Sequence, residues 1–326
     1  MSKLTFPILQ RLADGQFHSG EALAKHFKVT RATIFNALAH AQTLGVAMFS
    51  VRGRGYKLPQ PVVFLNHDAV LQAIGEQGEW FNVLVLDEVP STNTYLMQLA
   101  SKGAPHVTCV AAHMQTQGKG RRGRTWVSQL GASLTFSLLW RFQCGASALS
   151  GLSLAIGVAL IRAFEQLGVQ QAQLKWPNDV LVNGKKLAGI LIELQGDMEG
   201  PSAAVIGVGI NLNLPKEVLH SIDQPAIDVA TASSEGVANP NEVLGTVLKH
   251  IANCLQQFEQ DGFAGLRDEW LRHHAYHQQA VRLLMPNGVE THGVVQGVAE
   301  DGILLVETAF GLQRFSAGEI SLRGAS

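Results

Sequence analysis

The chain has 326 residues, of which 46% are hydrophobic and 16% are charged, and its formal net charge at pH 7 is −1. This length and composition are typical of a soluble globular protein with two or three domains. The most apolar run, residues 152–164, is too short to cross a bilayer and contains Arg162, so we expect no membrane span.

The cysteines and the N-terminal residues indicate the cellular compartment. Cys109, Cys144 and Cys254 lie far apart, and none belongs to a Cys-x-x-Cys pair. An odd number of isolated cysteines favours free buried thiols over disulfides or a zinc site. The first residues lack the long apolar region and small-residue cleavage site of a secretory signal. We therefore expect a cytoplasmic protein that has no protein-bound metal.

Charge is unevenly distributed along the chain. Residues 1–60 contain eight Lys and Arg against two Asp and Glu, a balance of +6, so the remaining residues carry −7. A small basic module joined to a larger acidic body suggests that the front of the chain binds an anionic polymer.

The first 45 residues have the spacing of three short helices. The first ends at Asp14-Gly15, the second begins after the N-cap Ser19, and the third lies between the N-cap Thr30 and Gly45. The apolar positions predicted for the third helix are Ala32, Ile34, Phe35, Leu38 and Leu44. Two β-prone runs, 46–51 and 52–58, surround a basic turn with glycines and indicate a hairpin.

This arrangement resembles a winged helix-turn-helix, in which cations at the start of the third helix and on the hairpin meet DNA phosphates. A three-helix interaction module is the alternative, but the position of the cations favours DNA binding. The predicted DNA contacts are Thr30, Arg31, Thr33, Asn36, Arg52 and Arg54. Pro59-Gln60-Pro61 then marks a linker to the next domain.

The middle of the chain alternates between apolar strands and amphipathic helices. Strands are predicted at 83–86, 107–114, 133–140 and 203–209, and helices at 148–167 and 241–263. Another helix opens at Ser91-Thr92-Asn93, where Ser91 is the expected N-cap.

A glycine-rich basic loop follows Gln115. Between Gly118 and Trp126 it places four cations within six residues: Lys119, Arg121, Arg122 and Arg124. Clustered cations require an anion, and glycines allow the backbone to close around one. Nucleotide phosphates are therefore the expected ligand, with Trp126 available to stack on a base. A solvated basic face or a nucleic-acid patch is the alternative.

Two familiar nucleotide motifs are rejected. The spacing Gly118-x-Gly120-x-x-Gly123 matches a dinucleotide fingerprint, but cations fill the intervening positions and a β-like run follows instead of a helix. No P-loop sequence occurs in the chain.

Further polar clusters lie after the basic loop. Residues 175–179 read Lys-Trp-Pro-Asn-Asp, Lys185 and Lys186 stand at the mouth of an apolar strand, and Asn211 ends another strand. One lysine of such a pair is usually only solvated. His273, His274 and His277 are predicted to form a helical surface cluster and not a metal-ligand set.

The C-terminal segment predicts a small antiparallel barrel. Short strands at 281–285, 289–298, 303–306 and 312–315 are separated by turns that include Pro286-Asn287-Gly288 and Asp301-Gly302. On the residues alone, this unit could be a cap that only stabilises its neighbour.

Five stretches occur in order along the chain: Ser91-Thr92-Asn93, Gln115 with Gly118–Arg124, Lys175–Asp179, Lys186–Gly189 and Gly209–Asn211. Together they resemble the biotin protein ligases. The N-terminal module makes the bifunctional bacterial form, which is both biotin ligase and biotin operon repressor, the best match. The resemblance covers essentially the whole chain.

The resemblance implies an α/β (α+β) protein with three domains. These are a winged helix-turn-helix at 1–65, a mixed-sheet catalytic domain of the biotin/lipoate ligase type at 66–272, and an SH3-like β-barrel at 273–326. In the implied reaction, biotin and Mg²⁺-ATP form biotinyl-5′-AMP and pyrophosphate. A lysine of the biotin carboxyl carrier protein of acetyl-CoA carboxylase then receives biotin, and AMP leaves.

The resemblance also assigns roles by position. Lys186 is the first choice for a catalytic residue, with Arg121 and Lys119 beside it. Biotin is implied to contact Ser91, Thr92, Asn93, Gln115, Lys119, Gly120, Arg121 and Lys186. The nucleotide is implied to contact Gly118, Arg122, Arg124, Trp126, Asn178, Asp179 and Asn211.

For repression, the resemblance implies that bound adenylate favours a homodimer, through the acidic central body, that places two winged helices on operator DNA. The family loop commonly has arginine where this chain has Lys119, which keeps the charge but loses the bidentate guanidinium. We therefore expect adenylation to persist and retention of the intermediate to be weaker.

Three rival functions stay open on the sequence. One is a transcription factor that senses a ligand without ligase activity, which the intact basic loop and Lys186 disfavour. The second is a lipoate ligase, against which residues 91–93 and the basic loop argue. The third is a ligase that does not bind DNA, against which the arginines of the N-terminal module argue.

Overall fold

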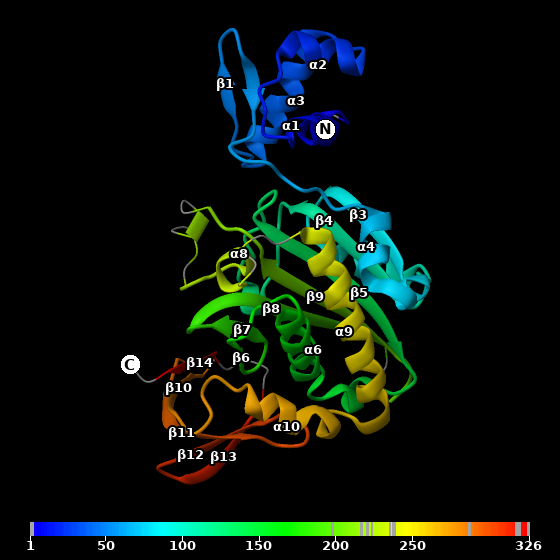
Figure 1. Cartoon of the computed structure of the whole chain (residues 1–326). Coiled ribbons are helices and arrows are strands. Elements are labelled where there is room, and N and C mark those ends of the chain that lie inside the picture. The colour runs from blue at the N-terminus through cyan, green and yellow to red at the C-terminus, as the bar shows by residue number, and fades with distance from the viewer. Residues whose placement is uncertain are drawn as a thin grey trace.

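The computed structural model describes residues 3–196, 199–215, 218–219, 222, 224–234, 236, 239–285, 288–316 and 321–324. Within these ranges the chain forms an N-terminal module, a central body built on one large sheet, and a C-terminal sheet at the opposite end of the body (Figure 1). Pro286 and Asn287, which were predicted to form a turn, lie outside the described residues.

The N-terminal module has the predicted winged helix-turn-helix order. Its elements are α1 (Thr5–Leu12), α2 (Gly20–Phe27), α3 (Arg31–Thr43), β1 (Phe49–Val51) and β2 (Gly55–Lys57). Both predicted N-caps are confirmed, because Ser19 Oγ accepts from the Ala22 N–H at 3.0 Å and Thr30 Oγ1 accepts from the Thr33 N–H at 3.2 Å. These bonds satisfy backbone donors that a helix start leaves without partners.

The predicted apolar face of α3 was wrong at two positions. Ala32 is exposed and Phe35 is 61% exposed, whereas Ile34 and Leu38 are buried as expected. The buried stripe of α3 includes two alanines and consists of Ile34, Ala37, Leu38 and Ala41. Phe35 therefore faces away from the core of the module.

The central body is built on a seven-stranded sheet in the order β3-β4-β5-β9-β8-β7-β6. Only β3 and β4 are parallel neighbours, and the other pairs are antiparallel. The strands are β3 (Asn82–Val89), β4 (Thr108–Gln115), β5 (Ser133–Phe142), β6 (Ala172–Lys175), β7 (Asp179–Val182), β8 (Lys185–Gly196) and β9 (Ser202–Asn211).

Helices cover both faces of this sheet (Figure 1). On one face α4 (His67–Ile74), α6 (Leu152–Gln166) and α9 (Pro240–Asp261) form the main core with the sheet. On the other face α5 (Thr92–Ser101) packs with a smaller cluster from β4, β5 and β9. Shorter elements are η1 (Gly75–Trp80), η2 (Arg121–Gly123), η3 (Ala146–Leu149) and α8 (Val229–Ala232).

The helix predicted from residue 148 begins later. A 3₁₀ turn ends at Leu149, and Gly151 follows with φ +80° as the N-cap of α6. A Cβ at Gly151 would lie 2.6 Å from Phe263 Cβ, so both the backbone angle and the space require glycine. This glycine separates the two elements that the apolar pattern had joined.

The C-terminal sheet follows α10 (Ala264–Arg272) and is antiparallel, as predicted. Its strands are β10 (Ala280–Leu284), β11 (Glu290–Val298), β12 (Leu304–Thr308), β13 (Gly311–Phe315) and β14 (Ser321–Gly324), in the order β13-β12-β11-β10-β14. The strand β14 was not predicted. The buried apolar residues of this sheet belong to the same core cluster as the central body.

The prediction of a helical surface cluster of histidines was wrong. His273, His274 and His277 lie after the end of α10, and His274 is buried against Trp270 with ring centroids 4.5 Å apart. In the described ranges no group of three or more His, Cys, Asp or Glu is placed to hold a metal ion. The same ranges contain no helix with the length and apolarity that a bilayer crossing requires.

Candidate functional site

The carboxyl ends of the parallel strands β3 and β4 bring two predicted stretches together. Beyond β3, Ser91 caps α5 by accepting from the Thr94 N–H at 3.5 Å, which confirms the expected N-cap. At the end of β4, Gln115 Oε1 accepts from the Thr92 N–H at 2.7 Å and from Thr92 Oγ1 at 3.1 Å. Parallel neighbours end at the same edge, so residues 23 positions apart meet there.

A chain of hydrogen bonds continues from Thr92 across the sheet. Ser137 Oγ, buried on β5, lies 2.8 Å from Thr92 Oγ1 and 2.5 Å from Asn93 Oδ1. Asn93 Nδ2 donates to Glu193 Oε2 at 2.8 Å and to the Leu191 carbonyl at 3.1 Å. These bonds hold a row of donors and acceptors in fixed orientations, the arrangement that recognition of a polar ring requires.

Three glycines on β8 and β9 form a floor beside this row. A Cβ at Gly207 would lie 2.1 Å from Asn93 Oδ1, and a Cβ at Gly209 would lie 2.3 Å from Trp126 Cε2. A Cβ at Gly189, opposite Gly209 in the ladder, would lie 3.2 Å from Trp126 Cζ3. The Trp126 indole therefore lies flat on the sheet. Any side chain larger than that of glycine at Gly189 or Gly209 would prevent this contact.

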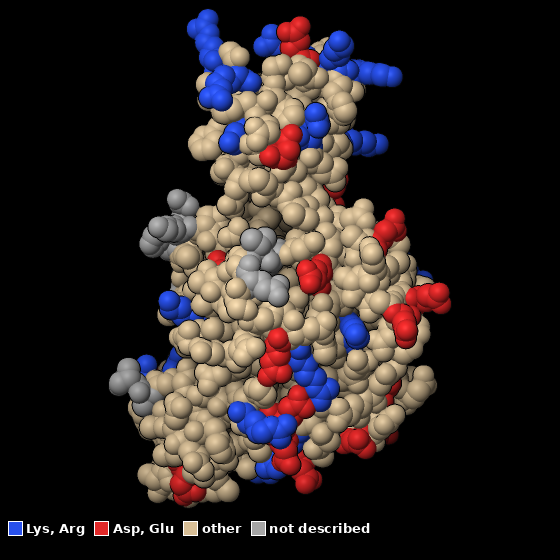
Figure 2. Space-filling model, viewed as in Figure 1, with Lys and Arg blue, Asp and Glu red and all other residues tan. Residues whose placement is uncertain are grey.

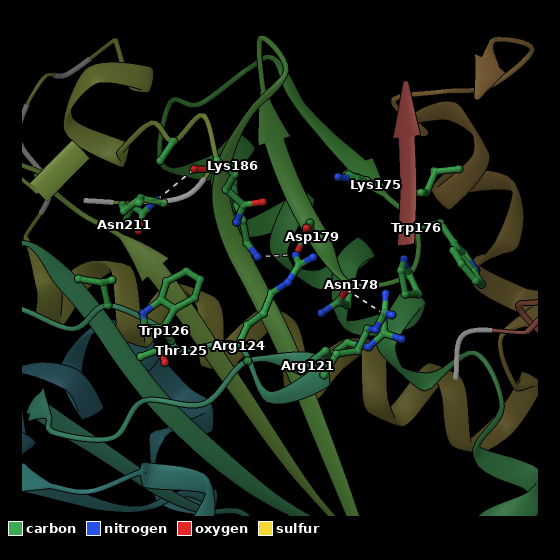
Figure 3. Close-up of a pocket in the computed structure, with 18 residues that line it drawn as sticks. Arg121, Arg124, Thr125, Trp126, Lys175, Trp176, Asn178, Asp179, Lys186 and Asn211 are labelled. Atoms are coloured by element: carbon green, nitrogen blue, oxygen red, sulfur yellow. Dashed lines mark hydrogen bonds and ion pairs between the residues drawn. The ribbon is translucent and has the colours of Figure 1, made fainter. Parts of the chain in front are cut away.

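The basic loop closes on itself as a hairpin. The Trp126 N–H donates to the Gly118 carbonyl at 3.0 Å, and the Gly120 N–H donates to the Arg124 carbonyl at 2.7 Å. A Cβ at Gly118 would lie 2.4 Å from the Trp126 carbonyl oxygen, so the base of the hairpin requires glycine. Figure 3 shows Arg121 and Arg124 of this loop reaching the region of Asn178 and Asp179.

Residues 175–186 contain one ion pair of their own and accept one hydrogen bond from the basic loop (Figure 3). Lys186 Nζ lies 2.7 Å from Asp179 Oδ1, with the two side chains 16% and 15% exposed, and Arg121 Nη1 donates to Asn178 Oδ1 at 3.2 Å. Burial lowers the pKa of Arg121, although the nearby charge of Asp179 acts in the opposite direction. Burial also lowers the pKa of Lys175. Desolvated cations attract an anion more strongly than solvated ones.

Two cavities share this region as a common wall. The smaller, about 60 Å³, is lined by Ser91, Thr92, Asn93, Gln115 and Lys119 among others. The larger, about 130 Å³, is lined by Arg122, Arg124, Trp126, Asp179 and Asn211 among others. The residues that line both cavities are Gly120, Arg121, Trp126, Asn178 and Lys186.

The predicted site residues thus fall into two adjoining groups. All eight residues predicted for biotin line the smaller cavity, and six of the seven predicted for the nucleotide line the larger one. The exception is Gly118, which lines a wider groove of about 960 Å³ on the outer side of the basic loop. Asn211 also has a positioning contact, because its Nδ2 donates to the Lys186 carbonyl at 3.0 Å.

Several residues of the site had no predicted role. Lys175 and Trp176 line the larger cavity, and the Trp176 indole N–H donates to the Gly302 carbonyl of the C-terminal sheet at 3.1 Å. Ser137 and Gly207 were also missed. A glycine within an apolar strand signals close approach of another group, so the Gly-x-Gly pattern of β9 was the available clue.

The predicted DNA contacts lie together on the N-terminal module. Thr30, Arg31, Asn36, Arg52 and Arg54 are exposed, and Thr33 is half-buried. Arg54 of the hairpin turn lies over the ring of Phe17, 4.2 Å from its centroid, so its guanidinium contacts the segment between α1 and α2. Figure 2 shows Lys and Arg side chains projecting from this module, while many Asp and Glu side chains lie on the body below it.

Known family models match three parts of the chain. Residues 85–211 match the biotin/lipoate A/B protein ligase family, residues 277–323 match the biotin protein ligase C terminal domain, and residues 5–57 match an HTH domain. The three matches correspond to the central body, the C-terminal sheet and the N-terminal module.

Similar proteins cover the whole chain. The bifunctional ligase/repressor BirA of Salmonella typhimurium is 35% identical over 100% of both chains, and that of Escherichia coli is 34% identical over 98% of this chain and 97% of its own length. The solved biotin protein ligase of Aquifex aeolicus in complex with biotin and ATP has a TM-score of 0.63 at 31% identity. That alignment covers 75% of this chain and 99% of the other.

Proposed function

The chain belongs to the biotin protein ligases, and from this premise we propose that it activates biotin with ATP and transfers it to a lysine of a carrier protein. The observation that supports this most directly is the wall shared by the two cavities, which contains Lys186 and Arg121. With biotin in the smaller cavity and ATP in the larger one, the carboxylate of biotin and the phosphates of ATP both face this cationic wall.

The first reaction joins a carboxylate to a phosphate. An oxygen of the biotin carboxylate attacks the α-phosphorus of ATP, the bond to the β-phosphate oxygen breaks, and pyrophosphate leaves with its electron pair. Both reactants are anions that repel each other at this distance, and Lys186 and Arg121 offset that repulsion. Asp179 and Asn178 orient these two cations before substrate arrives.

The second reaction transfers the acyl group. The neutral amine of a carrier-protein lysine attacks the carbonyl carbon of biotinyl-5′-AMP, AMP leaves with the electron pair of the broken anhydride bond, and the amine loses a proton. We assign the acceptor to the biotin carboxyl carrier protein of acetyl-CoA carboxylase. No covalent enzyme intermediate is required. Consistent with that, burial raises the pKa of the Cys109 thiol and raises the pKa of Cys254 to about 11.

The binding roles follow from the two cavities. The ureido ring of biotin has both donors and acceptors, which match the fixed amides and hydroxyls around Thr92, Asn93 and Gln115. The nucleotide occupies the larger cavity beside Arg124 and Trp126. Mg²⁺ enters with ATP as part of the substrate, and the oxygens of Asn178 and Asp179 are ligands of the type it favours.

The same chain is a biotin-responsive repressor. Its N-terminal module exposes the predicted contacts on α3 and the hairpin, where cations meet phosphates. We propose that biotinyl-5′-AMP is the corepressor, that it promotes a homodimer, and that the dimer occupies a palindromic operator. We place the protein in the cytoplasm, where its three free thiols remain reduced.

Two adjacent lysines provide a matched test. Lys186 lines both cavities, whereas its neighbour Lys185 is exposed and lines neither. We expect biotin-dependent exchange of pyrophosphate into ATP to fall by about 10²–10³-fold in Lys186→Ala and to stay at the wild-type rate in Lys185→Ala. Equal exchange in the two variants would contradict the assignment.

The same pair of variants tests the repressor coupling and the rival functions. Biotin with ATP should strengthen DNA binding by Lys185→Ala and not by Lys186→Ala. A wild-type protein that binds biotin and DNA but exchanges no pyrophosphate would be a ligand sensor. Exchange that depends on lipoate in place of biotin would identify a lipoate ligase.

A further inference from the structure

A threonine hydroxyl in the wall of the smaller cavity lacks a protein partner. Thr135 on β5 is 1% exposed, and its Oγ1 makes no hydrogen bond with any residue in the described ranges. Two residues further along β5, the hydroxyl of Ser137 contacts both Thr92 and Asn93. A buried hydroxyl without a partner costs the full desolvation of that group, so such an atom in a cavity wall indicates a missing ligand.

The sheet register places Thr135 between the two ends of the site. Thr135 is opposite Gly209 on β9, and Ser137 is opposite Gly207. Directly opposite residues share a face of the sheet. Trp126 lies on Gly209 and Asn93 lies on Gly207. Along the sheet, Thr135 is therefore two residues from the Ser137 position that contacts Asn93, and it lies on the side towards Trp126.

A ligand with a polar ring at one end and a carboxylate at the other must cross this position. The proposed headgroup contacts lie around Thr92, Asn93 and Gln115, and the proposed carboxylate contact is Lys186. Trp126 stands near that second end, with Lys186 Nζ 5.5 Å from its ring centroid. A ligand that reaches from the headgroup contacts to Lys186 therefore passes along the glycine floor, which Thr135 borders.

The indole of Trp126 now covers part of this floor. The cavity of about 60 Å³ is well below the roughly 300–1,000 Å³ of a usual small-molecule site. Trp126 Nε1 is, like Thr135 Oγ1, a buried atom without a hydrogen-bond partner among the described residues. Movement of this ring off Gly209 would enlarge the cavity and leave both polar atoms available to a ligand.

We propose that Thr135 is a biotin-recognition residue whose hydroxyl bonds a polar atom of the headgroup once Trp126 has left Gly209. The proposal rests on the ligase function proposed above. A hydroxyl can donate and accept, so its partner is a ureido oxygen, a ureido N–H or the ring sulfur. The hydroxyl is left unpaired in the ligand-free floor because its partner belongs to the substrate.

The test compares Thr135→Val, which has nearly the same shape without the hydroxyl, with Thr135→Ser, which keeps the hydroxyl. We expect calorimetry to give a biotin Kd about 10-fold weaker for Thr135→Val and within about threefold of wild type for Thr135→Ser. Ligand-free Thr135→Val should melt at or above the wild-type Tm, because it removes an unpaired buried hydroxyl. Its biotin-induced rise in Tm should be smaller than that of wild type.

Thr108 supplies a matched control. It is a fully buried threonine on the neighbouring strand β4, and its Oγ1 donates to the Pro105 carbonyl at 2.8 Å. Thr108→Val should lower the Tm without changing the biotin Kd, which is the behaviour of a structural hydroxyl. Thr135→Val that binds biotin within twofold of wild type would overturn the proposal, whatever its Tm.

Desthiobiotin, which keeps the ureido ring and lacks the sulfur, identifies the atom. A 10-fold effect that persists with this analogue assigns the contact to the ureido group, and an effect that disappears assigns it to the sulfur. Both results support a headgroup contact. A wild-type protein that binds no biotin would overturn the ligase function itself, which separates that failure from failure of the Thr135 proposal.

Discussion

The central body meets its two neighbours through junctions of different kinds. The N-terminal module has its own core cluster, to which the body adds Met114 as a buried member. The buried apolar residues described in the C-terminal sheet all belong to the main core of the body. One neighbour is thus attached as a separate unit, whereas the other forms part of the body that contains the site.

The first junction lies at the ends of the strands that deliver the proposed biotin contacts. His113 on β4, two residues before Gln115, lies between Phe6 of α1 and Phe64 of the linker, with ring centroids 6.0 Å and 4.8 Å away. Glu88 near the end of β3 faces His40 of α3 at 3.7 Å. None of these residues belongs to the main core cluster of the body.

The second junction supports the wall of the larger cavity. The Gly302 carbonyl accepts from Trp176, and the Leu174 N–H donates to the His273 carbonyl at 2.7 Å. Both contacts belong to β6 and the residues that follow it, and this segment leads to Asn178 and Asp179. Loss of the C-terminal packing would therefore loosen the proposed nucleotide side of the site.

The largest expected effect is at Gly302. Its φ is +77°, and a Cβ there would lie 2.8 Å from Gly151 Cα. We expect Gly302→Val to lower the free energy of unfolding by about 3 kcal/mol and to reduce pyrophosphate exchange, because the added side chain separates the C-terminal sheet from α6. Chemical denaturation of the whole chain measures the first effect.

Gly311 separates the clash from the backbone strain. Its φ of +88° is equally unfavourable for valine, but among the described residues no atom beyond its two chain neighbours lies within 4 Å of a Cβ built there. Gly311→Val should cost about 1 kcal/mol and leave exchange unchanged. Equal losses in the two variants would show that the contact between Gly302 and Gly151 does not hold the junction together.

Each junction also contains one buried histidine. Burial lowers the pKa of His113 to about 4 and that of His274 to about 3, below the ordinary value of 6.5. The unfolded or undocked state therefore binds the proton first as the pH falls. The stability that depends on each neutral ring is fully present above about pH 6.5 and is lost as the pH falls towards the folded pKa.

Acid should therefore affect the two junctions differently. Protonation of His274 requires opening of the main core. On going from pH 7 to pH 4, the wild type should therefore lose up to roughly 3 kcal/mol more of its free energy of unfolding than His274→Phe loses. Protonation of His113 requires only that the N-terminal module separate from the body. His113→Phe should keep the module attached at acidic pH, as measured by small-angle scattering, without changing the acid unfolding of the body.

Local sequence signals predicted most elements and few of the contacts between them. The caps Ser19, Thr30 and Ser91 were predictable because capping depends on nearby residues only. The floor partners Ser137 and Gly207 were missed because the register of β5 and β9 joins residues 70 positions apart. Long-range pairing of this kind leaves no local pattern in either strand.

The same reason explains the wrong predictions of burial at Phe35 and His274. Phe35 was assigned to the core because a large aromatic outweighs alanine in an apolar pattern, yet the neighbouring helices fit the alanines. His274 was assigned to the surface because its bridge to Leu174 of β6 joins residues far apart in the sequence, which the local sequence does not indicate. The domain limits at 65 and 272 stay a proposal.

The smallest expected effect is at the ion pair of the first junction. His40 and Glu88 are 25% and 13% exposed, and they are 3.7 Å apart. The two half-buried groups are too far apart for a hydrogen bond, so a double-mutant cycle of His40→Ala and Glu88→Gln should give a coupling below about 1 kcal/mol. The readout is amide exchange at the Val62 N–H, which bonds the Ala13 carbonyl at 3.0 Å across the linker. A coupling of several kcal/mol would mean that this ion pair, and not the contact of His113 with Phe6 and Phe64, holds the N-terminal module on the body.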